Sequence, residues 1–448
     1  MSAILCSEAN RIAMLCSVMM VAGVLIMGCK AEKEPVAPAP WPPKFAHSKV
    51  ATTLGGWHAT TRTTIRLVFP RHGKWLVFRG DPHSYHFSDD GLTWTATECP
   101  QASRSHLIDG DDITTFYSVM TLEGPPKWAF DTFICQGTLS EEDNRITWNA
   151  PHKLDTRVAY YNDLKQDSRG YVTMTGRAVM FDDNEQPAGT EVLWKRSSRP
   201  NDISNWDPDI RCINHTGDKG TGKPDSWKKV GSTAHENLTL EDGKSIVIAM
   251  MTSQGKGRLL ANLHDGKTWG KEDIELADNM STWAGTDRRM CAAFDAEAKV
   301  IHLAYVDGGG TLWYRKAVTP YGKDDWSEPL QLQTIKTFTT VLSLDTSQQP
   351  AHVYVLFGKT LFENKGDLRN TYGELYLQRF DGKTWSEPVL VSEAGTEENW
   401  YPNMNEDVRD GIGVLYLKGS GGAKTQRGKP ALDILFASTG PPKSQPRD

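Results

Sequence analysis

The chain of 448 residues has few cysteines and lacks the short motifs that bind transition metals or phosphate. None of its seven cysteines forms a CxxC pair, and no HExxH or His-x-His spacing occurs, so a zinc-type site has no support. A Gly-rich phosphate loop is also absent. The net charge of -6 is spread without long runs of one sign, which argues against a nucleic-acid partner. We expect no metal and no cofactor.

Long amphipathic helices are missing as well. No segment after the N-terminal region shows a sustained 3.6-residue apolar period with helix caps. Short runs rich in β-branched and aromatic residues are common instead, such as Trp75 to Phe78, Ser245 to Met250 and His352 to Phe357. Gly or Asp bounds these runs, a pattern that is typical of strands. The chain is therefore predicted to be all-β.

A tryptophan repeat organises these strands. Short polar turns end in tryptophan at steps of 54 to 63 residues, at positions Trp94, Trp148, Trp206, Trp269, Trp326 and Trp385. Several of the turns contain Asp-Gly, the strongest short-range hairpin signal, because both residues tolerate positive φ. A unit of this length copied many times indicates a repeat architecture. Groups of about four strands per repeat predict a β-propeller of four-stranded antiparallel blades.

The ends of the chain bear on the number of blades. The segments from Gly411 to Leu417 and from Pro430 to Phe436 form a strand pair after the sixth tryptophan, which leaves the last blade short of a strand. Phe45 to Leu54 is strand-like and has no hairpin partner ahead of it. If this N-terminal strand completes the last blade, no exposed edge remains. We therefore favour seven blades over residues 45–438, with six as the alternative, followed by a polar tail at 439–448.

The first 29 residues resemble a bacterial lipoprotein signal. An apolar run from Ile12 to Met27 ends at Gly28-Cys29, and in that family the cysteine is lipidated after cleavage. Residues 30–44 are rich in proline and read as an extended tether. The resemblance implies an extracytoplasmic monomer held to a bacterial membrane only through lipid on Cys29, at the periplasm or the cell surface. In an oxidising compartment the remaining four cysteines allow three disulfide pairings.

The first strand of each propeller blade lines the central channel, so the residues that begin these strands converge. Polar or aromatic side chains stand at most of the predicted starts: Arg62, His106, Asn162, His235, Glu236, Arg289 and Tyr401. Polar residues also begin strands simply to satisfy their hydrogen bonds. We take this set as the candidate site and expect it at one end of the channel.

The tryptophan turns resemble the Asp-box, or BNR, repeat of sialidases and related propellers. The family form is Ser-x-Asp-x-Gly-x-Thr-Trp, and the first copy here matches at Asp89, Gly91, Thr93 and Trp94. In that family the motif is a structural turn far from the active site. The repeat therefore implies the fold and does not by itself imply the reaction.

Other stretches resemble the catalytic segments of sialidases. Tyr401-Pro402-Asn403-Met404, ahead of Gly411 to Tyr416, resembles the segment that carries the nucleophilic tyrosine. His235-Glu236-Asn237 resembles the segment with the glutamate that activates it. Arg62 and Arg289 are placed as ligands of a substrate carboxylate, and Asp81 as the acid/base. A neutral phenol suits an anionic sugar better than a carboxylate nucleophile does, and it needs a neighbouring base.

One departure bears on the substrate. Sialidases hold the carboxylate with three arginines, and the place of the second is occupied here by Ala249-Met250-Met251-Thr252. The predicted activity is therefore an exported, sialidase-like glycoside hydrolase acting on an anionic glycan whose sugar stays open. One alternative is a polysaccharide lyase, in which His106 or His235 would take a proton from a uronic acid. The other is a propeller that binds glycans without catalysis.

Overall fold

The computed structural model describes most of the chain after the N-terminal region, within one compact unit, Pro40–Asp448. The described ranges are 40–53, 66–80, 83–99, 105–120, 130–158, 160–184, 187–215, 234–253, 256–280, 289–362, 372–395, 399–419 and 432–443. These residues form strands and two single-turn 3-10 helices, η2 (Glu241–Gly243) and η3 (Lys323–Asp325). Within them, no helix is long and apolar enough to cross a membrane.

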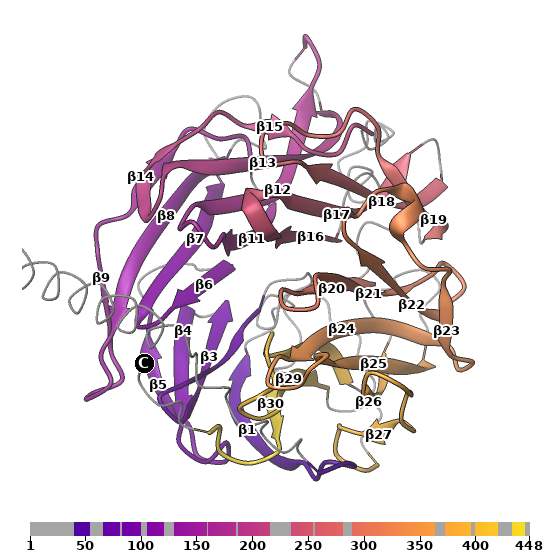
Figure 1. Cartoon of the computed structure of the whole chain (residues 1–448). Helices are drawn as coiled ribbons and strands as arrows, with labels where there is room; N and C mark the ends of the chain where they lie inside the picture. The colour runs from indigo at the N-terminus through magenta and orange to yellow at the C-terminus, as the bar shows by residue number, and fades with distance from the viewer. Residues whose placement is uncertain are drawn as a thin grey trace, which may run out of the picture. The chain divides into compact units, whose positions relative to one another are not determined.

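Five separate antiparallel sheets radiate from a common axis (Figure 1). The first contains β2 (Val68–Arg71), β3 (Lys74–Gly80), β4 (His83–Ser88) and β5 (Thr95–Glu98). The second contains β6 (Ser105–Asp109), β7 (Asp112–Met120), β8 (Phe130–Leu139), β9 (Ile146–Trp148) and β10 (His152–Leu154). The third contains β11 (Tyr160–Gln166), β12 (Val172–Phe181), β13 (Pro187–Arg199), β14 (Asp202–Trp206) and β15 (Ile210–Arg211).

The fourth sheet contains β16 (Ala234–Thr239), β17 (Ser245–Ser253), β18 (Lys256–His264) and β19 (Ile274–Met280). The fifth contains β20 (Met290–Asp295), β21 (Val300–Val306), β22 (Leu312–Val318) and β23 (Leu330–Gln333). In all five, consecutive strands pair as neighbours, apart from short outer strands such as β9 and β15. The first strands lie against one another around the axis, β6 beside β11, β11 beside β16 and β16 beside β20. This is the arrangement of a propeller, as the sequence predicted.

The remaining strands form one eight-stranded sheet, so the prediction of seven separate blades, or six, is wrong for the described residues. One half consists of β24 (Thr337–Asp345), β25 (His352–Phe362), β26 (Tyr372–Phe380) and β27 (Val389–Leu390). The other consists of β28 (Asn399–Met404), β29 (Gly413–Lys418), β30 (Leu432–Ser438) and β1 (Ala46–Thr53). The halves join where Gly373 pairs with Asn399.

Gly373 lies at this junction between strands on both sides. The amide Nδ2 of Asn399 on β28 donates a hydrogen bond to the Gly373 carbonyl over 2.9 Å. A Cβ atom on Gly373 would stand only 1.7 Å from the Lys359 carbonyl oxygen on β25, so any side chain would push β26 away from β25. The close approach of β26 to β28 merges what would otherwise be two blades.

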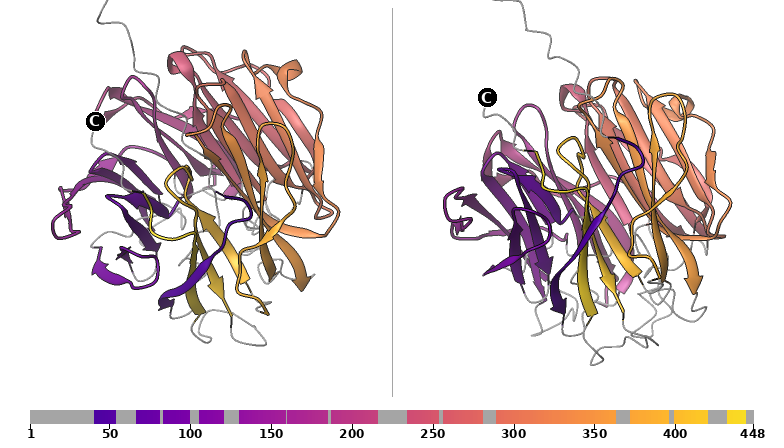
Figure 2. Two further views of the ribbon diagram at one scale, coloured as in Figure 1. Left: turned by 60° about the horizontal axis from the view of Figure 1, so that its bottom comes forward. Right: turned by 90° about the horizontal axis from the view of Figure 1, so that it is seen from below.

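The N-terminal strand closes the ring, as the sequence predicted. β1 pairs antiparallel with β30, from Ala46 opposite Ser438 to Thr53 opposite Leu432, and the two lie side by side in Figure 2. Ser48 on β1 also receives a hydrogen bond from the Trp94 indole N–H (2.9 Å). The first tryptophan turn is thereby fastened to the strand that completes the last sheet.

The tryptophan turns have the predicted structural role, with one correction. Asp90, rather than Asp89, accepts hydrogen bonds from the backbone N–H groups of Leu92 (2.7 Å) and Thr93 (2.8 Å). Asp265 and Asp381 accept the equivalent pairs in their own turns. These bonds lower the pKa of Asp90 below its ordinary value of 3.8. Asp89 is 80% exposed and faces Lys74.

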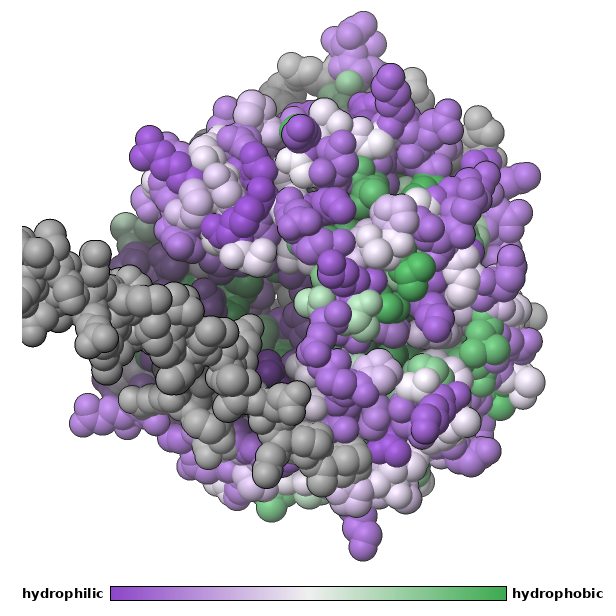
Figure 3. Space-filling view, viewed as in Figure 1, coloured by the Kyte–Doolittle hydropathy of each residue, from purple (hydrophilic) through white to green (hydrophobic). Residues whose placement is uncertain are grey.

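The core consists of apolar residues packed between neighbouring sheets. Trp75 is fully buried and meets Phe436 edge-on at 5.3 Å across the closing junction. Cys99, Cys135, Cys212 and Cys291 are buried, and each is a thiol rather than half of a disulfide, so none of the three possible pairings is present among these four. The face turned toward the viewer is mostly hydrophilic, with apolar residues in scattered patches (Figure 3).

Candidate functional site

The inner strands bring the described candidates to one end of the ring. His106 is the second residue of β6, Asn162 the third of β11, and Tyr401 the third of β28, while Arg289 directly precedes β20. His235 and Glu236 follow Ala234 at the start of β16. Inner strands of antiparallel blades run in one direction along the axis, so these positions share what we call the strand-start end. Arg62, Asp81 and Cys29 lie outside the described residues.

Glu236 is a buried carboxyl held between two blades. Its side chain is 2% exposed, and Oε1 accepts a hydrogen bond from the Ala292 backbone N–H on β20 over 3.4 Å. Burial raises the pKa of Glu236, and the nearby carboxylate of Asp163 raises it further, to about 8. Because an ordinary glutamate titrates near 4.5, Glu236 carries a proton over a pH range in which other carboxyls have lost theirs.

Asp163 occupies the corresponding place on β11. It is 6% exposed, and Oδ2 accepts a hydrogen bond from the Asn237 backbone N–H on β16 over 2.9 Å. Burial raises its pKa to about 6, against the opposing effect of Lys165. Asp163 and Glu236 thus form a pair of buried carboxyls on adjacent inner strands, each bonded to the backbone of the next blade.

Arg66 balances these carboxyls, although sequence reasoning did not select it. It precedes β2, is 6% exposed, and donates hydrogen bonds to the carbonyls of Leu342 (2.6 Å) and Met404 (3.0 Å). Its Nη2 also lies 3.4 Å from Cys291 Sγ. Burial alone would lower the pKa of Arg66, but Cys291 and nearby carboxylates, Glu236 among them, raise it. The sequence feature that could have identified Arg66 is its position as a charged residue within the apolar run Ile65 to Phe69.

A second cation lies further along β11. Lys165 forms an ion pair with Glu406, with Nζ 2.6 Å from Oε1. Burial opposes the charge on Lys165, but Glu406 and then Asp163 raise its pKa overall. The same pair lowers the pKa of Glu406 against the effect of its own burial. The axis therefore holds two cations, Arg66 and Lys165, among three carboxyls.

The two candidate histidines are buried. His235 is fully buried, and its Nε2 lies 3.3 Å from the Thr175 carbonyl oxygen. His106 stacks on Phe78 with the ring centroids 3.7 Å apart and an interplanar angle of 21°. Burial lowers the pKa of His106 to about 3, so the imidazole is neutral at physiological pH. Both rings are packed as parts of the core.

Arg289 is anchored by its own blade. It is 6% exposed, and its Nη1 donates a hydrogen bond to the Asp307 carbonyl oxygen over 2.8 Å. The Arg289 carbonyl in turn accepts a hydrogen bond from the Val306 N–H over 2.7 Å. These bonds hold the guanidinium at the strand-start end of β20.

Tyr401 stands in an unusual backbone conformation. It has a φ of 48°, which is uncommon for an aromatic residue. The register between β28 and β29 shifts between Trp400 and Asn403, and β11 has a similar shift between Tyr160 and Asp163. Bulges re-aim side chains and recur beside active sites. Tyr401 is 6% exposed and packs with Trp400 and Leu415.

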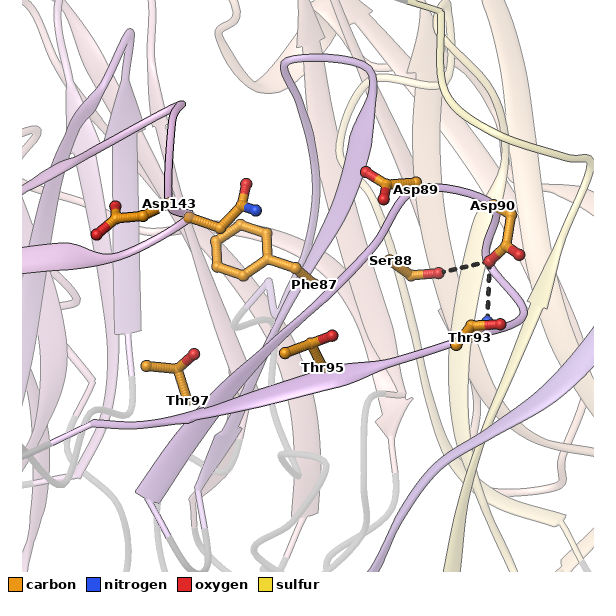
Figure 4. Close-up of a pocket in the computed structure, with 9 residues that line it drawn as sticks. Phe87, Ser88, Asp89, Asp90, Thr93, Thr95, Thr97 and Asp143 are labelled. Carbon is orange, nitrogen blue, oxygen red and sulfur yellow. Dashed lines mark hydrogen bonds between the residues drawn. The ribbon is translucent and has the colours of Figure 1, made fainter.

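A small pocket lies away from the axis, at the outer strands β4 and β5 (Figure 4). It has a volume of about 190 Å³ and is lined by the first tryptophan turn, Thr95, Thr97, Asp143 and Asn144. The Asp90 carboxylate points to the Ser88 hydroxyl and the Thr93 amide in this view. The turn thus occupies the Asp90 carboxylate, while Asp89 and Asp143 also line the pocket. Among the described residues, no group of three or more His, Cys, Asp or Glu side chains is arranged to hold a metal ion.

Comparison with known proteins gives only distant relatives. No family model matches the chain, and no curated protein matches it in sequence. Among solved structures, a Trypanosoma rangeli sialidase is 9% identical with a TM-score of 0.42, covering 90% of this chain and 60% of that one. A Penicillium chrysogenum α-L-arabinanase complexed with arabinobiose is 14% identical with a TM-score of 0.43, covering 73% and 90%.

The NanB sialidase from Streptococcus pneumoniae is 13% identical, with a TM-score of 0.40 and coverage of 90% of this chain and 71% of that one. Several of the structural neighbours are therefore glycoside hydrolases. The chain spans 60% of the length of the trypanosomal sialidase. At these identities and scores, the neighbours leave the substrate of this protein open.

Proposed function

We propose that this protein is a glycoside hydrolase whose active site lies at the strand-start end of the axis. The observation that carries the proposal is the pair of buried carboxyls Asp163 and Glu236, with pKa values raised to about 6 and about 8. Glycosidases depend on carboxyls that are held in different protonation states near neutral pH. Ordinary carboxyls at a strand start would both be ionised at pH 7.

The two pKa values give the pair one proton at pH 7. Because the groups interact, the proton belongs to the pair, and Glu236 holds it for most of the time. We assign the nucleophilic role to Tyr401 and its activation to the ionised form of Glu236, which takes the phenol proton when the tyrosine oxygen attacks. Asp81 has the acid/base role at the leaving oxygen. Asp163 sets the pKa of Glu236.

An anionic glycan is the proposed substrate. The charges of Arg66 and Lys165 are balanced by the carboxyls around them, whereas Arg289 lies at the strand-start end and is held there by the Asp307 carbonyl. Arg62 and Arg289 are the proposed ligands of a substrate carboxylate. His106, His235 and Asn162 remain proposed binding residues around it. The buried histidines support this neighbouring role better than a role as the proton-abstracting base of a lyase.

The setting of this activity is also a proposal. Cys29 would carry a lipid that holds the monomeric domain to the outside of a bacterial membrane, and residues 30–44 would separate the two. Labelling of the intact protein with a radioactive fatty acid, lost in Cys29→Ala, would test the anchor.

The test of the activity is product release from defined glycans. The protein is incubated with 3′-sialyllactose, with a uronic-acid oligosaccharide and with arabinobiose, and free reducing sugar is measured. We expect release from an anionic substrate, a rate that rises as the pH approaches about 8 because the ionised form of Glu236 takes the Tyr401 proton, and a loss of at least about 100-fold in Glu236→Gln and Tyr401→Phe. Asp89→Asn, on an exposed side chain, serves as the control.

Other outcomes would select the alternatives. A product with ultraviolet absorbance from the uronic-acid oligosaccharide would indicate β-elimination and therefore a lyase. Binding of a glycan without any product would indicate a propeller that only binds. Activity that is unchanged in Glu236→Gln would remove the carboxyl pair from the mechanism.

A further inference from the structure

An exposed aromatic stack stands at the strand-start end, between β25 and β26. Phe362, the last residue of β25, is 46% exposed and pairs in register with Tyr372, the first residue of β26. Their rings stack with centroids 4.9 Å apart and an interplanar angle of 18°. Tyr372 meets Trp400 edge-on at 5.3 Å, and Trp400 is only 3% exposed. A buried anchor thus fixes the orientation of a ring that remains largely in solvent.

A polar pair follows the stack on the same face of the sheet. A register shift between Thr360 and Phe362 places Phe362 on the side that carries Lys359. Lys359 forms an ion pair with Glu374 across the strands at 3.4 Å, and both side chains are partly exposed, at 37% and 24%. Hydrogen-bonding groups therefore follow the aromatic rings along the same face of the sheet.

The stack continues directly into the candidate site. Trp400, on which Tyr372 rests, is the residue before Tyr401 and shares its apolar cluster. A ligand ring on the outer face of Phe362 would therefore be separated from Trp400 by the rings of Phe362 and Tyr372. The area is small: Leu361, at 42% exposed, is the apolar neighbour in the chain. A protein partner would need about 800 Å² on each side, far more than two rings and one leucine provide.

We propose that Phe362 and Tyr372 form a platform for a pyranose ring of the glycan that lies beyond the sugar whose bond is cleaved. This inference rests on the proposed function, because it places the platform relative to Tyr401. Sugars present an apolar C–H face and a rim of hydroxyls, and binding sites combine aromatic faces with a few polar groups to match them. Since the stack already fixes the Phe362 ring, little side-chain entropy is lost when the sugar binds.

The experiment compares a long and a short substrate. Full-length wild type and Phe362→Ala are assayed with 3′-sialyllactose and with the methyl glycoside of the same sialic acid, and binding of each is measured by calorimetry. We expect the KM of Phe362→Ala for the trisaccharide to rise about tenfold with kcat unchanged, while the values for the methyl glycoside stay the same. Phe362→Tyr keeps the ring and should keep the wild-type KM. Leu330→Ala, at an equally exposed apolar residue on β23 (48%), is the matched control.

The outcomes separate the platform from the hydrolase. If wild type cleaves the trisaccharide and Phe362→Ala has the same KM, the platform is refuted and the hydrolase stands. If wild type binds the trisaccharide without cleaving it and Phe362→Ala binds at least about tenfold more weakly, the hydrolase is refuted and the platform stands. If wild type neither binds nor cleaves the trisaccharide, the uronic-acid oligosaccharide or arabinobiose, both proposals fail.

Discussion

Replacing Glu236 with glutamine should make the protein more stable and less active. The carboxyl has a raised pKa because burial and Asp163 disfavour its charge. Glutamine has nearly the same shape and is neutral at every pH. Its amide oxygen can still accept the hydrogen bond from the Ala292 N–H that Glu236 receives at 3.4 Å. The substitution therefore removes the cost of charging this position and leaves its contacts in place.

The size and sign of the effect follow from the two pKa values. The folded protein binds the Glu236 proton more tightly than the unfolded chain does, so wild-type stability falls as pH rises from about 4.5 to about 8. The shift of about 3.5 pH units sets a ceiling of roughly 5 kcal/mol. Asp163 can take up part of the proton, so we expect about half of this. With an unfolding entropy of about 2.1 cal/mol/K for each of about 400 residues, Tm should rise by roughly 3 °C.

Thermal unfolding of both proteins at a series of pH values checks this reasoning. Near pH 5 the wild type and Glu236→Gln should unfold at similar temperatures, because Glu236 is protonated in the folded protein. At pH 8 and above the variant should unfold at the higher temperature, while the proposed hydrolysis of the glycan is lost. A variant that is no more stable than wild type at pH 8 would show that ionising the buried Glu236 carboxyl does not cost the folded protein the expected free energy.

Two further substitutions test the framework around the site. Arg66→Met should lower the free energy of unfolding by about 3 to 5 kcal/mol, because it leaves two buried carbonyls and two carboxyls without their cation. Urea titration measures this free energy, and a loss below about 1 kcal/mol would contradict the prediction. Arg66→Lys, which keeps the positive charge, is the milder comparison. Asp90→Ala should lower Tm at pH 7 while Asp89→Ala leaves it unchanged. Since the pKa of Asp90 is lowered from 3.8, the contribution of Asp90 to stability is present above that pH and is lost as the pH falls below it. Equal Tm values for the two variants at pH 7 would contradict the assignment of Asp90 as the acceptor in this turn.

The blades were predictable because their signals are local. Each tryptophan turn encodes its own geometry within a few residues, as the Asp265 and Asp381 amide bonds demonstrate. The pairing of β1 with β30 was predictable because a strand without a hairpin partner and a blade with a missing strand complete one another. The merging of two groups of strands at Gly373 was not predictable, because the sequence around that glycine does not indicate which distant strand pairs with it.

The charged residues at the axis were harder to predict for the same reason. Arg66 donates hydrogen bonds to the Leu342 and Met404 carbonyls, more than 270 residues away in the chain, and Lys165 reaches Glu406 across the ring. These contacts depend on the register of several inner strands at once. Even within a motif the sequence did not identify the right residue. Two adjacent aspartates, Asp89 and Asp90, fit the pattern almost equally well, and the structure shows that Asp90 is the acceptor.

The inner strands use the same polar groups to join blades and to supply charge. Asp163 accepts a backbone hydrogen bond from the next blade at Asn237, Glu236 does so at Ala292, and the Asn403 side chain does so at Leu67 where the ring closes. A carboxyl fixed between two blades cannot relax away from its neighbours, so burial and repulsion keep its pKa raised. Groups locked by surrounding packing also lose little free energy to reorganisation during a reaction. The closed ring is therefore what allows an ordinary glutamate to hold its proton at neutral pH.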